Sequence, residues 1–276
     1  MSEVSDQPSN QTSRHDAWQA GESYEFYMGR WSRRIAPLFL DLVALPRELD
    51  WLEVGCGTGA LSAAILALCD PESLIAIDPS EGFLAKARAS VPDPRAEFRQ
   101  GDAQAIDVET ASRDAAVSAL MLNFVPDKVK ALSEMKRTVR PGGTVAFYVW
   151  DYAGGGLEFL RAFWRQAAAL DAGAGNLTED KRFPFCTADG LSALAREAGL
   201  SAVTCEALVT PTVFSSFDDY WRPFTLGAGP APGYVANLAE EAREELRSRL
   251  EASLPRGADG SIALEARAWA VRAKVE

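Results

Sequence analysis

Residues 52–60 read LEVGCGTGA and carry three glycines, Gly55, Gly57 and Gly59, just after the acid Glu53. Glycines at a strand-to-helix turn let a ligand lie against bare backbone. The spacing fits a dinucleotide-binding fingerprint, because Ala60 stands at the third glycine position, where alanine is allowed. A carboxylate two residues before Gly55 would repel a pyrophosphate but suits a cation or an amine. The stretch therefore predicts a nucleotide-like ligand and leaves its identity open.

Two further acids follow predicted strands. Asp78 ends the second strand, where an acid can hydrogen-bond both hydroxyls of a ribose, although alone it would also serve as a helix cap. Asp102 follows the third strand, where an acid can accept a hydrogen bond from an adenine amine, although alone it would be an ordinary turn residue. Together with Glu53, they favour a nucleoside with a cationic amino-acid tail over a dinucleotide.

Short apolar runs alternate with segments of helical spacing around these acids. This rhythm predicts a parallel sheet with helices on both faces and all ligand-binding loops along one edge. We expect strands over 50–55, 73–78, 96–100, 114–120 and 143–150, and helices from about Ser32 and over 58–69, 81–90 and 127–139. Further helices are expected over 156–170 and 187–200, and two late strands over 201–214 and 261–275, the last antiparallel.

The fold class predicted is α/β, a Rossmann-like doubly wound sheet of seven strands, mostly parallel, with helical cap insertions. We expect residues 1–20 to be a disordered polar tail and residues 21–276 a single domain. Within that domain, 48–150 form the ligand-binding core, and 151–186 and 215–260 are inserted over the ligand edge. The only histidine, His15, lies in the tail, which argues against histidine chemistry in the folded body.

The order of these motifs resembles that of class I S-adenosylmethionine-dependent methyltransferases. The resemblance covers about residues 48–150: LEVGCGTG matches the first motif, Ile77-Asp78-Pro79-Ser80 the ribose loop, Gly101-Asp102-Ala103 the adenine loop and Arg140-Pro141-Gly142-Gly143 the turn before the fifth strand. It implies S-adenosylmethionine as the cofactor. YMGRWSR and the later segments resemble, more weakly, the members that methylate small molecules, and this implies a small-molecule acceptor.

The resemblance also implies roles for particular residues. It places the methionyl part of the cofactor against Gly55, Cys56 and Gly57, with Glu53 near its amine. It assigns the ribose to Asp78 and Pro79 and the adenine to Asp102 and Ala103, and it lines the methyl-transfer side with Ser118, Ala119 and Leu120. Asn123 stands near a position where relatives often carry a histidine, which removes one familiar base or substrate contact.

An aromatic arm precedes the first helix and includes Tyr24, Tyr27, Arg30 and Trp31. We expect it to fold over the cofactor, with Tyr24 in contact and Arg30 pairing the methionyl carboxylate; otherwise its aromatic rings simply cover the core. Methyl transfer is an in-line displacement that mainly needs positioning and exclusion of water. The candidate acceptor-side residues are Tyr27, Asn123, Asp151 and Tyr152. The stretch FDDYWRPF (217–224) either walls the acceptor pocket or anchors the cap.

Composition narrows the remaining classes. The formal charge of −11 disfavours nucleic acid as a partner, and no apolar run is long enough to cross a membrane. The four cysteines form no CxxC pair and have no histidine cluster beside them, so we expect no metal site, and reduced thiols in a cytoplasmic protein. Three alternatives stay open: a protein methyltransferase, a non-catalytic S-adenosylmethionine-binding module, and a nucleotide-dependent oxidoreductase. The sequence does not indicate the oligomeric state.

Overall fold

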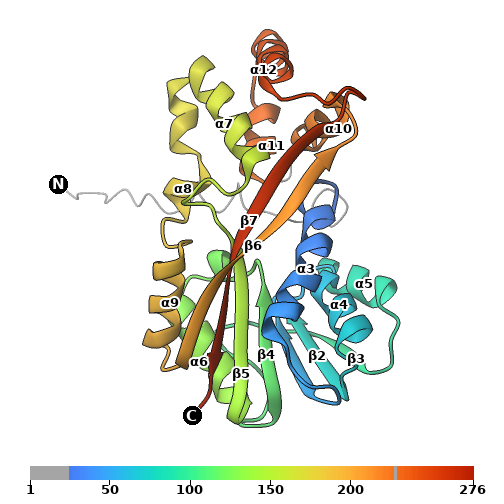
Figure 1. The fold of residues 1–276 in the computed structure, drawn as a ribbon, viewed down its shortest axis with the longest axis vertical. Coiled ribbons are helices and arrows are strands. Elements are labelled where there is room, and N and C mark those ends of the chain that lie inside the picture. Colours follow the sequence, from blue (N-terminus) through green and yellow to red (C-terminus); the bar gives the residue numbers. More distant parts are fainter. Residues whose placement is uncertain (1–24, 227–228) are drawn as a thin grey trace, which may run out of the picture.

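A seven-stranded sheet with the strand order β3-β2-β1-β4-β5-β7-β6 organises the chain (Figure 1). The computed structural model describes residues 25–226 and 229–276, with side chains from residue 27 onward. β7 is antiparallel to both of its neighbours, and the other pairings are parallel. The strands are β1 (Asp50–Val54), β2 (Ser73–Asp78), β3 (Ala96–Gln100), β4 (Arg113–Ala119), β5 (Val139–Trp150), β6 (Ser201–Phe214) and β7 (Ile262–Lys274).

Helices cover both faces of the sheet because its central strands are apolar on both sides. Trp51 and its same-face neighbours pack with α3 (Arg30–Val43), α4 (Ala60–Leu68) and α5 (Glu81–Ser90), where Phe39, Ile65 and Leu84 are fully buried. Leu52, on the opposite face, packs in a second core with α6 (Lys128–Thr138) and α9 (Ala188–Glu197). The doubly wound, mostly parallel sheet predicted from the alternation is confirmed.

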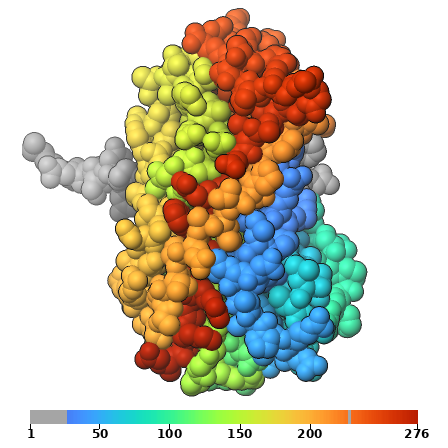
Figure 2. Space-filling model, in the orientation of Figure 1, coloured from blue at the N-terminus to red at the C-terminus, as the bar shows by residue number. Residues whose placement is uncertain are grey.

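The second half of the chain builds a helical cap beyond the carboxyl ends of the parallel strands. β6 and β7 continue past the sheet into this cap, and Figure 2 shows the yellow-to-red late segments making up the upper half of the molecule. Tyr220, fully buried, donates its hydroxyl to the Phe159 carbonyl at 2.8 Å, so 217–224 is fastened to α7 inside the cap. The cap contains α7 (Glu158–Leu170), η3 (Ala172–Asn176), α8 (Glu179–Arg182), α10 (Phe217–Trp221), η4 (Arg222–Thr225), α11 (Pro230–Ala236) and α12 (Glu240–Ser253).

The largest differences from the expected boundaries lie at the first helix and at the fifth strand. The first helical stretch starts earlier than Ser32, because a π-helical turn, η1 (Glu25–Gly29), runs directly into α3. The predicted turn over 140–143 does not precede the fifth strand but lies inside β5 as a bulge. Gly142 has a φ of +83° there and donates to the Val275 carbonyl at 2.7 Å, so the sheet continues past the bulge. No helix in the described part of the chain is long and apolar enough to cross a membrane.

Candidate functional site

The glycine loop joins β1 to α4 and uses backbone that only glycine adopts easily. Gly55 and Gly57 have φ values of +75° and +54°. A Cβ at Gly57 would meet no atom within 4 Å, whereas a Cβ at Gly55 would overlap the side chain of Met121. The loop therefore presents open space at Gly57, and at Gly55 it accommodates a side chain from the loop after β4.

Asp78 ties the end of β2 to this loop. Its Oδ2 accepts the Gly57 N–H at 2.9 Å and its Oδ1 accepts the Ser80 N–H at 2.9 Å. Burial raises the pKa of the Asp78 carboxyl, and the two backbone donors oppose that shift. A carboxylate can accept about four hydrogen bonds, so two acceptor positions remain for hydroxyl groups of a ligand.

Glu53 lies under the loop and is fully buried. One of its oxygens accepts a short hydrogen bond from the Ser62 hydroxyl, and the other, Oε1, is buried with no hydrogen-bond partner in the described part of the chain. Burial raises the pKa of Glu53 to about 8, and nearby Asp78 adds to the shift. Cys56, between the glycines, is buried too, and burial raises the pKa of its thiol so far that a thiolate nucleophile is not available there.

The remaining predicted cofactor contacts lie at the ends of the next strands. Asp102 is exposed after β3, with Oδ1 accepting the Gln104 N–H at 2.8 Å, and Ala103 packs partly into the second core. Pro79 is exposed, and its carbonyl accepts a hydrogen bond from Gln100 Nε2 at 3.0 Å. These positions line the same edge as Asp78, as parallel pairing of β2 and β3 requires.

β4 ends at Ala119, and the backbone then turns sharply. Leu120 is buried yet has a φ of +59°, a left-handed conformation that costs a branched side chain about 1–3 kcal/mol. Ser118 Oγ and Asn123 Nδ2 are both buried without a hydrogen-bond partner among the described residues. Strain and unsatisfied polar atoms at one strand end are typical of a ligand-binding loop rather than of a structural one.

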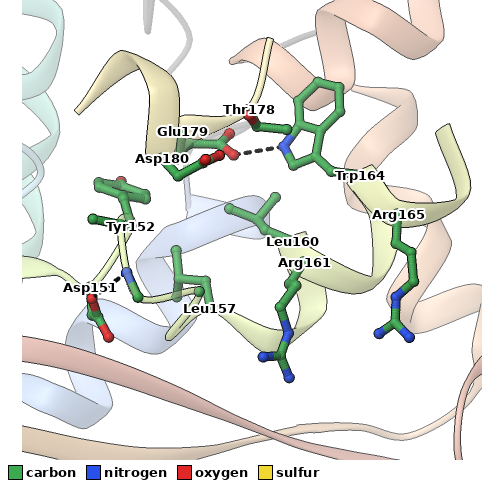
Figure 3. A pocket seen from close by; sticks show the side chains of 13 residues that line it. Asp151, Tyr152, Leu157, Leu160, Arg161, Trp164, Arg165, Thr178, Glu179 and Asp180 are labelled. Atoms are coloured by element: carbon green, nitrogen blue, oxygen red, sulfur yellow. Dashed lines mark hydrogen bonds between the residues drawn. The ribbon is translucent and has the colours of Figure 1, made fainter. Parts of the chain in front are cut away.

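Two cavities lie between this edge and the cap, and they share Tyr152, Leu160 and Glu179. The larger, of about 490 Å³, lies under α7 and α8, and Figure 3 shows its lining side chains. The smaller, of about 30 Å³, reaches from the shared wall to Leu120 and Tyr27. A small molecule in the larger cavity would thus have a narrow approach toward the end of β4.

Glu179 is the buried polar group of the shared wall. Its Oε2 accepts the Trp164 Nε1–H at 2.6 Å, drawn as a dashed line in Figure 3. Burial raises the pKa of Glu179 to about 7, although hydrogen bonds from its own backbone amide and from Trp164, together with the charge of Arg182, oppose the shift. Arg161 and Arg165 extend from α7 on another side of the same cavity. Sequence reasoning missed these residues, because amphipathic spacing over 156–170 shows a helix but not which cavity it lines.

Two of the predicted site residues have charged partners in the structure. Arg30 forms a fork with Asp219, with distances of 2.7 and 3.1 Å, and also donates to the Val213 carbonyl at 3.2 Å. This ion pair engages the guanidinium that we expected to pair with the cofactor carboxylate. Asp151, whose side chain is 1% exposed, pairs with Arg267 and accepts the Gly154 N–H at 2.8 Å. Its carboxylate therefore holds its own loop in place, and the residue lines the larger cavity.

The aromatic arm divides between packing and the cavity. Trp31 packs edge-on against Phe214, with ring centroids 5.2 Å apart, and lies in the core. Tyr27 packs against Phe224 at 5.7 Å and also lines the smaller cavity, as does Tyr152. Both tyrosines thus lie on the side where an acceptor was expected. Tyr24 and the tail, with His15, lie outside the described residues.

Comparison with known proteins decides the family. A family model described as "Methyltransferase domain" matches residues 52–147. A trans-aconitate 2-methyltransferase of Deinococcus radiodurans is 30% identical over 234 residues, which cover 78% of this chain and 84% of that protein. The chain belongs to the class I S-adenosylmethionine-dependent methyltransferases.

Other relatives of this methyltransferase are similar over most of its length. A trans-aconitate 2-methyltransferase of Methylobacterium nodulans is 26% identical and covers 90% of this chain and 94% of that protein. A solved structure of phosphoethanolamine N-methyltransferase 2 from Haemonchus contortus, in complex with S-adenosyl-L-methionine, has a TM-score of 0.60 and 17% identity, covering 98% of this chain and 62% of that one. The structural likeness supports the fold, and S-adenosylmethionine is the cofactor of the family.

The residues of the methyltransferase fit this cofactor. The open space at Gly57 admits a close ligand, Asp78 keeps free acceptor positions, and Glu53 has an unsatisfied oxygen. When bound, S-adenosylmethionine supplies an activated methyl group on a sulfonium.

Proposed function

We propose that the methyltransferase transfers the methyl group to a carboxylate oxygen of a small organic acid held under the cap. The supporting observation is the cavity of about 490 Å³, a typical ligand-pocket volume, whose lining includes the exposed residues Arg161 and Arg165. Their position is notable in a chain whose formal charge is −11. Arg161 has one weak partner, Glu158 at 3.3 Å, and Arg165 has no ion pair or hydrogen bond within the described ranges.

The chemistry of such an acceptor suits the residues at hand. A carboxylate is already ionised near neutral pH, so no general base has to remove a proton. Its oxygen attacks the methyl carbon; the O–C bond forms while the C–S bond breaks, and the products are a methyl ester and S-adenosylhomocysteine. The two full-length relatives named trans-aconitate 2-methyltransferases act, by those names, on a tricarboxylic acid. We infer that this chain takes an acceptor of that chemical class.

The cofactor contacts of the proposal remain those at the strand ends. We propose that Gly55, Cys56 and Gly57 receive the methionyl part, Asp78 and Pro79 the ribose, and Asp102 and Ala103 the adenine. Ser118, Ala119 and Leu120 would line the path of the methyl group. Tyr27 and Tyr152 would contact the acceptor, because the narrow cleft they share leads from the large cavity to Leu120. The reactive end of the acceptor must displace side chains in that cleft.

The test is turnover with a panel of mono-, di- and tricarboxylic acids, with methyl esters and S-adenosylhomocysteine detected by mass spectrometry. We expect at least one di- or tricarboxylate to be esterified. Arg165→Ala should raise its KM at least tenfold, whereas Arg249→Ala, which removes an exposed arginine of α12 that does not line the cavity, should not change KM. Methylation of a peptide instead would favour a protein methyltransferase, and cofactor binding without turnover on any acceptor would favour a binding module.

A further inference from the structure

Glu179 is a buried carboxyl group between the two cavities of the cap. It lies on the wall common to both cavities, and only 7% of the residue is exposed. Trp164 fixes one carboxyl oxygen by donating to it at 2.6 Å. A buried carboxyl group whose hydrogen-bond donors, the Trp164 indole and its own backbone amide, are both neutral is poorly compensated as an anion, and the protonated form avoids that cost.

The charged and titratable groups around Glu179 come from four segments. Arg182 and Asp180 flank it on α8 and oppose each other: Arg182 favours the anion and Asp180 disfavours it. Tyr27 comes from η1 and Tyr152 from the loop after β5, while Arg161 and Arg165 come from α7. The pKa of Tyr27 is raised well above its ordinary value, mainly by burial and then by the charge of Glu179, so Tyr27 stays neutral. Burial dominates the balance at Glu179 itself and raises its pKa to about 7.

We propose that Glu179 selects for an acidic acceptor because it is protonated in the acceptor site. As a neutral acid it donates a hydrogen bond to a carboxylate of the acceptor, and as an anion it repels that carboxylate. The Trp164 indole donates to Oε2, and we place the proton on Oε1. Arg161 and Arg165 would hold a second carboxylate on another side of the cavity. This assignment rests on the proposed function, because it assumes an acidic acceptor.

The proposal is tested by binding, so that it does not depend on turnover. Citrate serves as the probe, and its dissociation constant is measured by calorimetry from pH 5.5 to 8.5 in the presence of S-adenosylhomocysteine. For the wild type we expect affinity to fall by up to tenfold per pH unit above about pH 7, as Glu179 ionises. Glu179→Gln keeps a hydrogen-bond donor and the Trp164 contact but cannot ionise, so its affinity should be nearly independent of pH.

Asp180→Asn is the matched control, because it removes the same charge from the neighbouring, exposed residue. It should keep the pH-dependent loss of affinity, with a slightly lower midpoint, since the Asp180 charge raises the pKa of Glu179. If Glu179 only supported the local structure, Glu179→Gln would change the affinity for citrate by the same factor at every pH. The pH dependence of citrate binding would then be the same in Glu179→Gln and Asp180→Asn.

The outcomes distinguish this assignment from the proposed function. Citrate binding that weakens with pH only when Glu179 is present, with no methyl ester formed from any acid, supports the assignment and removes the proposed function. Esterification of an acid together with pH-independent binding of citrate supports the proposed function and removes the assignment of Glu179. Affinity that rises with pH and is lost in Glu179→Gln would make Glu179 a base for a protonated acceptor, which overturns the assignment, and absence of citrate binding at every pH overturns both.

Discussion

The Gly57 amide donates to the Asp78 carboxylate at 2.9 Å and so joins the loop after β1 to the end of β2. One carboxylate thereby holds the glycine loop in shape and keeps acceptor positions for hydroxyl groups of a ligand, which we propose are those of the ribose. Under this assignment, a single side chain couples the geometry of the loop to the affinity for the cofactor.

Replacing Asp78 should weaken cofactor binding. Asp78→Ala removes a charged acceptor for two hydroxyl groups and releases the Gly57 and Ser80 amides. We expect the affinity for S-adenosylmethionine to fall about 100-fold, measured by calorimetry. Glu81→Gln, which removes an exposed acid from the first turn of α5, is the control and should bind normally. Unchanged affinity in a folded Asp78→Ala protein would remove the ribose assignment.

Gly57→Ala should separate binding from folding. The open space at Gly57 admits a methyl group, so the variant should fold, with about 1–2 kcal/mol lost to the positive φ. The methyl group would occupy space that the cofactor needs, and we expect at least tenfold weaker binding. Gly142→Ala imposes similar strain at a φ of +83° in an equally open place on β5, and it should leave binding unchanged. Equal losses of affinity in both variants would argue against contact at Gly57.

Gly55 and Met121 should show non-additive effects on stability. Gly55→Ala places a methyl group inside the Met121 side chain, so it should destabilise the fold by about 2–4 kcal/mol through overlap and backbone strain. Met121→Ala vacates that space, and the double variant should recover about 1–3 kcal/mol of the loss. Urea unfolding of the four proteins of the cycle measures this coupling, and strictly additive changes would contradict the packing described.

Arg30→Ala should affect stability but not cofactor binding. Its ion pair with Asp219 is three-quarters buried on both sides and ties α3 to the cap, so its loss should cost about 1–2 kcal/mol. Because the guanidinium is engaged with the cap, the affinity for S-adenosylmethionine should change less than twofold. Asp219→Asn should reproduce the loss of stability. A large drop in affinity for Arg30→Ala alone would restore the cofactor role first expected for this residue.

The stability of the protein should fall with rising pH because of Glu53. The pKa of Glu53 is raised from 4.5 to about 8, so the folded protein binds more protons than the unfolded chain between these values. The stabilising effect of the proton is complete below about pH 4.5 and is lost as the pH rises through 8. Glu53→Gln removes this dependence and should gain stability relative to the wild type between pH 5 and about 9. If the free energy of unfolding of the two proteins had the same pH dependence across this range, Glu53 would be ionised in the folded protein.

Much of the fold could be read from the sequence because its signals are local. Strand 73–78, helix 81–90 and strand 201–214 occur as predicted, since apolar periodicity and caps such as Ser80 act within a few residues. Acids that follow successive parallel strands also share one edge of the sheet, because the carboxyl ends of parallel strands all lie at that edge. The sequence by itself thus determined the doubly wound sheet, the glycine loop and the nature of the cofactor.

Only the tertiary structure decided which partners the remaining side chains have. Arg30 meets Asp219 across 189 positions of sequence, and the cap joins Tyr27, Tyr152 and Glu179 around one narrow cleft. No periodicity connects residues so far apart, because their contacts depend on how the cap helices pack on β6 and β7. Burial, which sets the charge of Glu53 and Glu179, is likewise a property of the assembled core and not of the residues beside them in the chain.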